Sequence, residues 1–148
     1  MTKTQMRQWL VAGNGRAIVW VREHGDAGYE DLIVQTCLYN RIADLQCNDG
    51  YDWYNAELFA AAGRTDYYAT RLLDAYFGVR ETRYRERLAG VVGELAFRGN
   101  EPCREFIATN WRRELERHQT ELAEQHIRLK KKEGYEEVLE FLGTTRKR

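Results

Sequence analysis

The chain has 148 residues, 43% of them hydrophobic and 31% charged, and its 23 basic residues balance its 23 acidic ones. This length and composition indicate one globular domain with a real core and exclude a disordered chain. The formal net charge of zero excludes a global field that would attract nucleic acid or an anionic membrane, and no run approaches the roughly 18 apolar residues of a membrane span.

Helix-forming residues dominate from the N-terminus onward, and the chain has a single proline. Apolar residues recur at steps of three and four in successive segments, and the strict two-residue alternation of strands is absent. The segments lie around residues 16–24, 32–38, 54–62, 68–77 and 88–97. The pattern predicts an all-α fold, with N-terminal cap helices in residues 1–25.

The predicted helix ends repeat along the chain. Gly25, Gly63 and Gly99 each close an apolar run, as a C-terminal glycine does, and each spacing leaves room for two helices and a short loop. A polar residue that can cap the next helix follows each glycine: Asp26, Thr65 and Asn100. We therefore predict stacked helix pairs, an α-solenoid, over residues 26–111, with an irregular helical bundle as the alternative.

Particular residues carry a resemblance to a known family. The stretch from "LIVQTCLYNRIADLQCNDGYDWYNAELFAAAG" to "LAGVVGELAFRGNEPCREFI" is similar to bacterial HEAT-like repeat proteins over about Gly25 to Trp111. The matching positions are Cys37, Leu38, Asn40, Asp44, Gln46, Cys47, Leu95, Ala96, Phe97, Gly99 and Arg104. Asn48 departs from the acidic residue expected there. The resemblance implies a right-handed helical stack that binds other macromolecules, and it implies no catalytic site.

The C-terminal third has a different pattern. The stretch from Arg104 to Gly134 predicts one long helix, in which Leu115, Leu122 and Leu129 are seven residues apart like one position of a heptad. The companion heptad positions are polar, so the pattern is too weak for a regular coiled coil. We expect residues 112–148 to form a long C-terminal helix followed by a basic tail.

Candidate binding residues lie between the second and third apolar segments. Residues 40–52 are rich in turn-forming side chains, and they predict a loop that ends with Asp52 as the cap of the next helix. We expect the neighbouring aromatic residues to form an exposed patch at its rim, because tyrosine and tryptophan are favoured interface anchors. The predicted partner-binding residues are Tyr51, Trp53, Tyr54, Tyr67 and Trp111.

A stretch of alternating basic residues, "RETRYRER" at 80–87, supports an alternative function. A concave groove lined by arginines would bind phosphates, as in helical-repeat DNA glycosylases. The residues predicted for this nucleic-acid-binding alternative are Arg71, Arg80, Arg83, Arg112 and Arg113. Glutamates interspersed among them also fit ordinary surface ion pairing.

No catalytic motif or metal site stands out. Cys37, Cys47 and His24 lack the paired spacing of zinc ligands, and Glu114, His118 and Glu121 also fit a solvated helix face. Three cysteines without a Cys-x-x-Cys pair, and an N-terminus without a signal-peptide core, predict reduced thiols in the cytoplasm. We therefore predict a non-catalytic adaptor without cofactor or metal that binds a protein partner. A subunit of a larger assembly is a third possibility, and the oligomeric state stays open.

Overall fold

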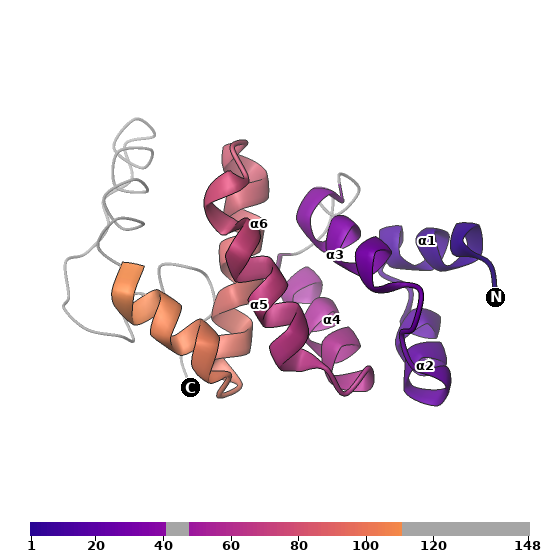
Figure 1. The fold of residues 1–148 in the computed structure, drawn as a ribbon. Coiled ribbons are helices and arrows are strands. Elements are labelled where there is room, and N and C mark those ends of the chain that lie inside the picture. Colours follow the sequence, from indigo (N-terminus) through magenta and orange to yellow (C-terminus); the bar gives the residue numbers. More distant parts are fainter. Residues whose placement is uncertain (41–47, 111–148) are drawn as a thin grey trace.

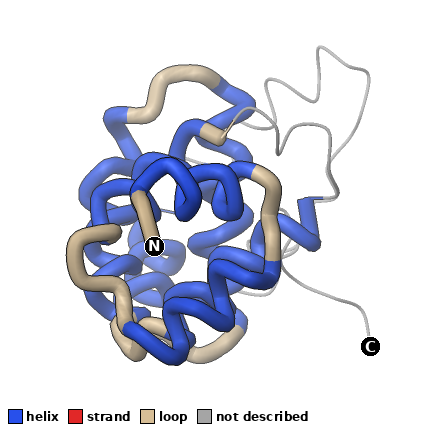
Figure 2. Tube along the Cα trace, turned by 90° about the vertical axis from the view of Figure 1, so that its right-hand side faces the viewer, coloured by secondary structure: helices blue, strands red, loops and turns tan. Residues whose placement is uncertain are grey.

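In the computed structural model, the described residues are 1–40 and 48–110, and they form helices joined by short turns, with no strand among them (Figure 2). The predicted all-α class is confirmed for these residues. The helices are α1 (Lys3–Val11), α2 (Gly15–His24), α3 (Glu30–Tyr39), α4 (Asn48–Ala61), α5 (Thr65–Ala75), the short 3-10 helix η2 (Tyr76–Gly78), α6 (Thr82–Phe97) and a last helical segment at 101–110.

The predicted glycine stops are confirmed. Gly25, Gly63 and Gly99 have φ values of 81°, 68° and 98°, a left-handed conformation that glycine adopts without strain. Gly25 lies between α2 and α3, Gly63 between α4 and α5, and Gly99 between α6 and the helical segment at 101–110. Gly13, at φ 63°, ends α1 in the same way. The turn signal in the sequence therefore fixes where the helices end.

The predicted caps are right at one position of three. The Asn100 side chain accepts a hydrogen bond from the Cys103 amide at 3.1 Å, as an N-cap residue does. Thr65 is instead the first residue of α5, after Arg64 in the cap position. Asp26 lies three residues before the α3 cap, and its carboxylate accepts hydrogen bonds from Arg64 and the Tyr68 hydroxyl. Asp26 therefore binds residues far away in the sequence and does not cap α3, and a local sequence pattern does not reveal such partners.

Helices two apart in sequence pack against one another. The odd-numbered helices α1, α3 and α5 form one series of contacts, and the even-numbered helices α2, α4 and α6 form a second. Neighbours in sequence, such as α1 with α2 and α5 with α6, link the two series. Figure 1 shows the helices following one another across the molecule from the N-terminus to the 101–110 segment.

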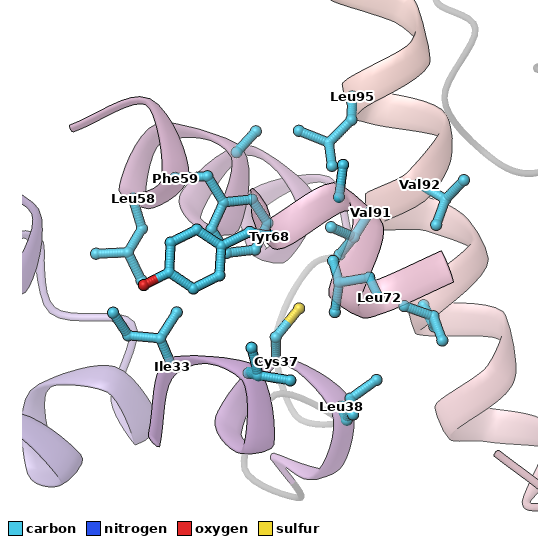
Figure 3. Close-up of a cluster of buried hydrophobic side chains, with 14 of the residues drawn as sticks. Ile33, Cys37, Leu38, Leu58, Phe59, Tyr68, Leu72, Val91, Val92 and Leu95 are labelled. Carbon is cyan, nitrogen blue, oxygen red and sulfur yellow. The ribbon is translucent and has the colours of Figure 1, made fainter. Parts of the chain in front are cut away.

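The core fills the space between the two series of helices. Figure 3 shows side chains from α3, α4, α5 and α6 pointing toward one another. The Phe59 ring stacks on the Tyr68 ring with centroids 4.8 Å apart, and both side chains are fully buried. The strongest apolar stripe of the sequence, in α6, supplies Val91, Val92 and Leu95 to this cluster. Burial of these faces is the main stabilising contribution.

Helix α4 begins earlier than the sequence predicts. Asp52 was expected to cap the helix, but the helix already starts at Asn48 and Asp52 is buried within it. The predicted loop is correspondingly shorter, and residues 41–47 lie outside the described residues. Of the predicted long C-terminal helix, the described part up to residue 110 is helical. None of the described helices has the length and apolar character that crossing a bilayer requires.

Candidate functional site

A cleft of about 300 Å³ lies where the C-terminal end of α1 meets α3 and the first half of α4. Its described lining residues are Leu10, Val11, Gly13, Ile33, Thr36, Asn40, Tyr51, Trp53, Tyr54 and Asn55. We call it the aromatic cleft. No charged side chain occurs among these lining residues, so the cleft favours an uncharged group.

Three of the predicted partner-binding residues meet in this cleft, but only one of them is exposed. Trp53 is 51% exposed, whereas Tyr51 and Tyr54 are 9% and 7% exposed. The predicted exposed patch is therefore wrong for the two tyrosines. The reason is that all three lie on a helix, where positions 51 and 54 share a face and position 53 points elsewhere. Trp53 forms the rim of the cleft and the tyrosines form its inner wall.

Hydrogen bonds between helices hold the wall in place. The Tyr51 hydroxyl donates to the Cys37 carbonyl, and the Tyr54 hydroxyl donates to the Asn14 carbonyl at 2.9 Å. The Asn40 side chain donates to the Val11 carbonyl at 2.9 Å. Burial raises the pKa of both tyrosines, so their hydroxyls stay protonated and remain donors at neutral pH. The cleft is thus preorganised.

Buried Arg87 of α6 supports the cleft from behind. Its guanidinium donates to the Asn40 carbonyl and lies 5.4 Å from the Tyr51 ring centroid and 4.8 Å from that of Tyr84. Arg87 is 5% exposed. Ordinary surface pairing is therefore the wrong interpretation for this residue of the "RETRYRER" stretch. Arg85 of the same stretch lies over the Tyr76 ring, with 5.0 Å to its centroid.

Two further hollows adjoin the cleft along α1 and α3. A second hollow of about 520 Å³ shares Val11, Thr36 and Asn40 with the cleft, and a third of about 530 Å³ shares Arg7 and Leu32 with the second. We call these three adjoining hollows the α1–α3 groove. The other residues that line the second and third hollows are Lys3, Thr4, Gly28, Glu30, Asp31, Gln35, Tyr39 and Tyr67. The groove therefore joins Tyr67 to the three aromatic residues at its other end.

The two walls of the groove differ in charge. On the α3 wall, Glu30 pairs with Arg64 at 3.2 Å and Asp31 pairs with Arg71 at 2.8 Å. On the α1 wall, Lys3 and Arg7 are exposed, and neither takes part in an ion pair within residues 1–40 and 48–110. Sequence reasoning missed these two residues, although Lys3–Val11 has basic residues four apart and no acidic one.

The three described arginines of the nucleic-acid alternative lie on α5 and around the start of α6. Arg71 of α5 is paired with Asp31 and donates to the Tyr67 hydroxyl at 3.0 Å. Arg83 of α6 pairs with Glu81 at 3.5 Å, and Arg80 is exposed just before that helix. The remaining predicted residues, Trp111, Arg112 and Arg113, lie outside the described residues.

The described residues offer no metal centre or reactive thiol. No group of three His, Cys, Asp or Glu side chains suited to a metal occurs in the described part of the chain. Burial raises the pKa of both the Cys37 and the Cys103 thiol to about 12, so each stays protonated at neutral pH. The other predicted candidates, Cys47 and the row from Glu114 to Glu121, lie beyond the described ranges.

The chain matches no protein-family model, no curated protein and no solved structure. The functional argument therefore depends on the geometry of the groove and on the order of the helices.

Proposed function

We propose that the chain is a non-catalytic, HEAT-like helical-repeat module that binds a protein partner along the α1–α3 groove. The repeat interpretation is supported by the two series of helix contacts, odd with odd and even with even, and by the glycines that separate successive pairs. In a solenoid each pair covers the apolar face of its neighbour, which gives this order of contacts.

One observation carries the binding role: exposed Trp53 stands at the rim of an uncharged cleft whose walls are fixed by interhelical hydrogen bonds. A large aromatic side chain that remains half exposed beside a preformed hollow is typical of an interface anchor. The two described cysteines, Cys37 and Cys103, are buried and protonated, so neither presents a thiolate at this surface.

Site-specific photo-crosslinking in cells that naturally make the protein tests this proposal. The photoreactive amino acid p-benzoylphenylalanine replaces Trp53 in one variant and Val19 in a matched control, since Val19 is 48% exposed on α2 and lies outside the groove. We expect a discrete, protease-sensitive adduct from position 53 and none from position 19.

The other outcomes overturn the proposal. Equal adducts from both positions, or none from either, would rule out the groove as a binding site. An adduct that nuclease digests would establish the nucleic-acid alternative instead, and the same chain would then be retained on heparin in a salt-dependent way.

A further inference from the structure

We infer that the α1–α3 groove binds an extended peptide segment of the partner, in which one uncharged apolar or aromatic side chain lies a few residues from acidic ones. This inference rests on the proposed function and names the chemistry of the partner. It is carried by two features at opposite ends of one groove: the uncharged lining of the aromatic cleft, and the cationic wall of α1, which has no ion pair within residues 1–40 and 48–110.

The aromatic cleft selects the anchor. Its volume of about 300 Å³ suits one large side chain, and aromatic rings and aliphatic side chains form most of its described lining. A charged side chain would lose its hydration there without meeting an opposite charge in the described lining, so the cleft disfavours it. Trp53 at the rim can cover the anchor once it is seated.

The α1 wall selects acidic residues. Lys3 and Arg7 are four residues apart on one helix, so both project from the same face into the third hollow. The carboxylates opposite them, Glu30 and Asp31, are already paired with Arg64 and Arg71. Arg64 also pairs with buried Asp26, at 3.2 Å. Among the described residues, the charged side chains that line this hollow are Lys3, Arg7, Glu30 and Asp31, and only the two carboxylates already have an ion-pair partner.

The direction of the helices strengthens this preference. The N-terminal residues of α1 and of α3 line the same hollow, since Lys3 and Thr4 lie there together with Glu30 and Asp31. The positive ends of both helix dipoles therefore point toward this end of the groove and favour negative charge. The uncharged cleft lies at the C-terminal end of α1, so the two preferences are spatially separated.

Helix α1 sets the distance between the aromatic cleft and the basic residues. Lys3 and Val11 are separated by about 12 Å along α1, at about 1.5 Å per residue. An extended peptide covers that length in about four residues. Arg7 lies half as far from Val11, at about two extended residues. We therefore expect acidic residues roughly two to four positions from the anchor.

Selection from a phage library of random dodecapeptides on the immobilised 148-residue chain tests the inference. Four targets are compared: the wild type, Trp53→Ala, the double variant Lys3→Glu/Arg7→Glu, and the control Arg16→Glu/Arg22→Glu. The control makes the same change in net charge at exposed residues of α2, outside the groove. Circular dichroism and thermal unfolding establish that all four targets are folded alike.

We expect wild-type and control selections to enrich peptides with an aromatic or leucine anchor and Asp or Glu two to four positions away. Synthetic copies of these peptides should bind Lys3→Glu/Arg7→Glu and Trp53→Ala on the order of tenfold more weakly than wild type. The loss in the double charge variant should shrink at high salt, because the contacts it removes are between exposed charges.

Three results would overturn the inference. They are enrichment of peptides without acidic residues, binding that ignores the α1 charge reversal, and failure of the library to enrich any peptide. If single-stranded DNA bound wild type but not Lys3→Glu/Arg7→Glu, the cationic wall would serve nucleic acid, which also contradicts it. The photo-crosslinking experiment at position 53 tests the proposed function separately. If it gives a protein adduct while the phage selection enriches no acidic peptides, only this inference is wrong and the proposed function stands.

Discussion

Two arginines tie distant parts of this fold together in contrasting surroundings. Arg87 is 5% exposed, donates to the Asn40 carbonyl and lies against the rings of Tyr51 and Tyr84. The Arg64 side chain is 37% exposed, and its ion pairs join the turn between α4 and α5 to Asp26 in the turn before α3 and to Glu30 at the start of α3. Arg87 contacts Asn40 and Tyr51 of the aromatic cleft, and Arg64 pairs with Glu30 at the other end of the groove.

The contrast in burial predicts a contrast in energy. When a buried donor is removed, its acceptor loses a hydrogen bond that water cannot replace. When half-exposed Arg64 is removed, water can hydrate Glu30, and buried Asp26 keeps the hydrogen bond from the Tyr68 hydroxyl, so we expect the smaller loss. The buried arginine should therefore contribute more to the stability of the fold than the half-exposed one.

The largest expected effect comes from Arg87→Ala. We expect it to lower the free energy of unfolding by about 3 kcal/mol, because the Asn40 carbonyl loses a charged donor and a cavity opens beside two rings. Arg64→Ala is the matched variant and should cost less. Urea unfolding followed by circular dichroism measures both. Equal losses in the two variants, or a larger loss for Arg64→Ala, would contradict the contrast.

Gly90 of α6 packs closely against α4 and provides a second test of the buried region. A Cβ atom added at Gly90 of α6 would lie 2.7 and 2.8 Å from the two carboxylate oxygens of Asp52, a residue that is 3% exposed. Alanine normally improves a helix by about 1 kcal/mol over glycine, but overpacking a buried site costs about 1–3 kcal/mol. We expect Gly90→Ala to destabilise the protein by about 1 kcal/mol in urea unfolding.

Gly15 provides the control for this prediction. It lies in the first turn of α2, and an added Cβ would meet no atom within 4 Å. Gly15→Ala should therefore leave the stability unchanged or raise it slightly. If Gly90→Ala stabilised the protein as well, the close approach of α4 and α6 at Asp52 would be wrong.

The sequence could predict features that depend on local signals, but not those that depend on distant partners. Helical periodicity and the glycines at 25, 63 and 99 are local signals, and they correctly predict an all-α fold with its helix ends. The partners of Asp26 and Arg87 are not local: Arg64 lies 38 residues from Asp26, and Asn40 lies 47 residues from Arg87. A pattern within one segment cannot show which charge will be buried by a helix that far away.

The candidate site was predictable to a similar extent. The residues Tyr51, Trp53 and Tyr54 were identified because aromatic side chains cluster there, but their exposure depended on a helix start that the polar stretch before them obscured. The α1 wall left a visible signal in Lys3 and Arg7. The sequence alone could not show that these two cations line a groove, because only the fold places α3 opposite them and shows that its carboxylates, Glu30 and Asp31, are already paired.

The smallest expected effect concerns Glu30, the more exposed of the two carboxylates that pair with Arg64. Hydrogen bonds from its own backbone amide, from the Arg64 guanidinium and from the Gly28 amide at 2.8 Å lower the pKa of this carboxyl, and they outweigh the opposing effects of burial and of Asp26. An unfolded glutamate has a pKa of about 4.3. Because the folded pKa is lower, Glu30 contributes stability above about pH 4.3 and loses it as the pH falls through the folded value.

Glu30→Gln should therefore cost less than about 1 kcal/mol near neutral pH, and the difference from wild type should shrink toward zero in acid. Urea unfolding at a series of pH values from about 7 to about 3 measures that difference. Glu23→Gln on α2, which removes one exposed negative charge outside the groove, is the control for the overall change in charge. A wild-type advantage that stayed constant or grew on acidification would mean that Arg64 and the amides at this turn do not stabilise the ionised form of Glu30. The end of the groove at Glu30 would then be held by packing alone, whereas the aromatic cleft is also held by hydrogen bonds between helices.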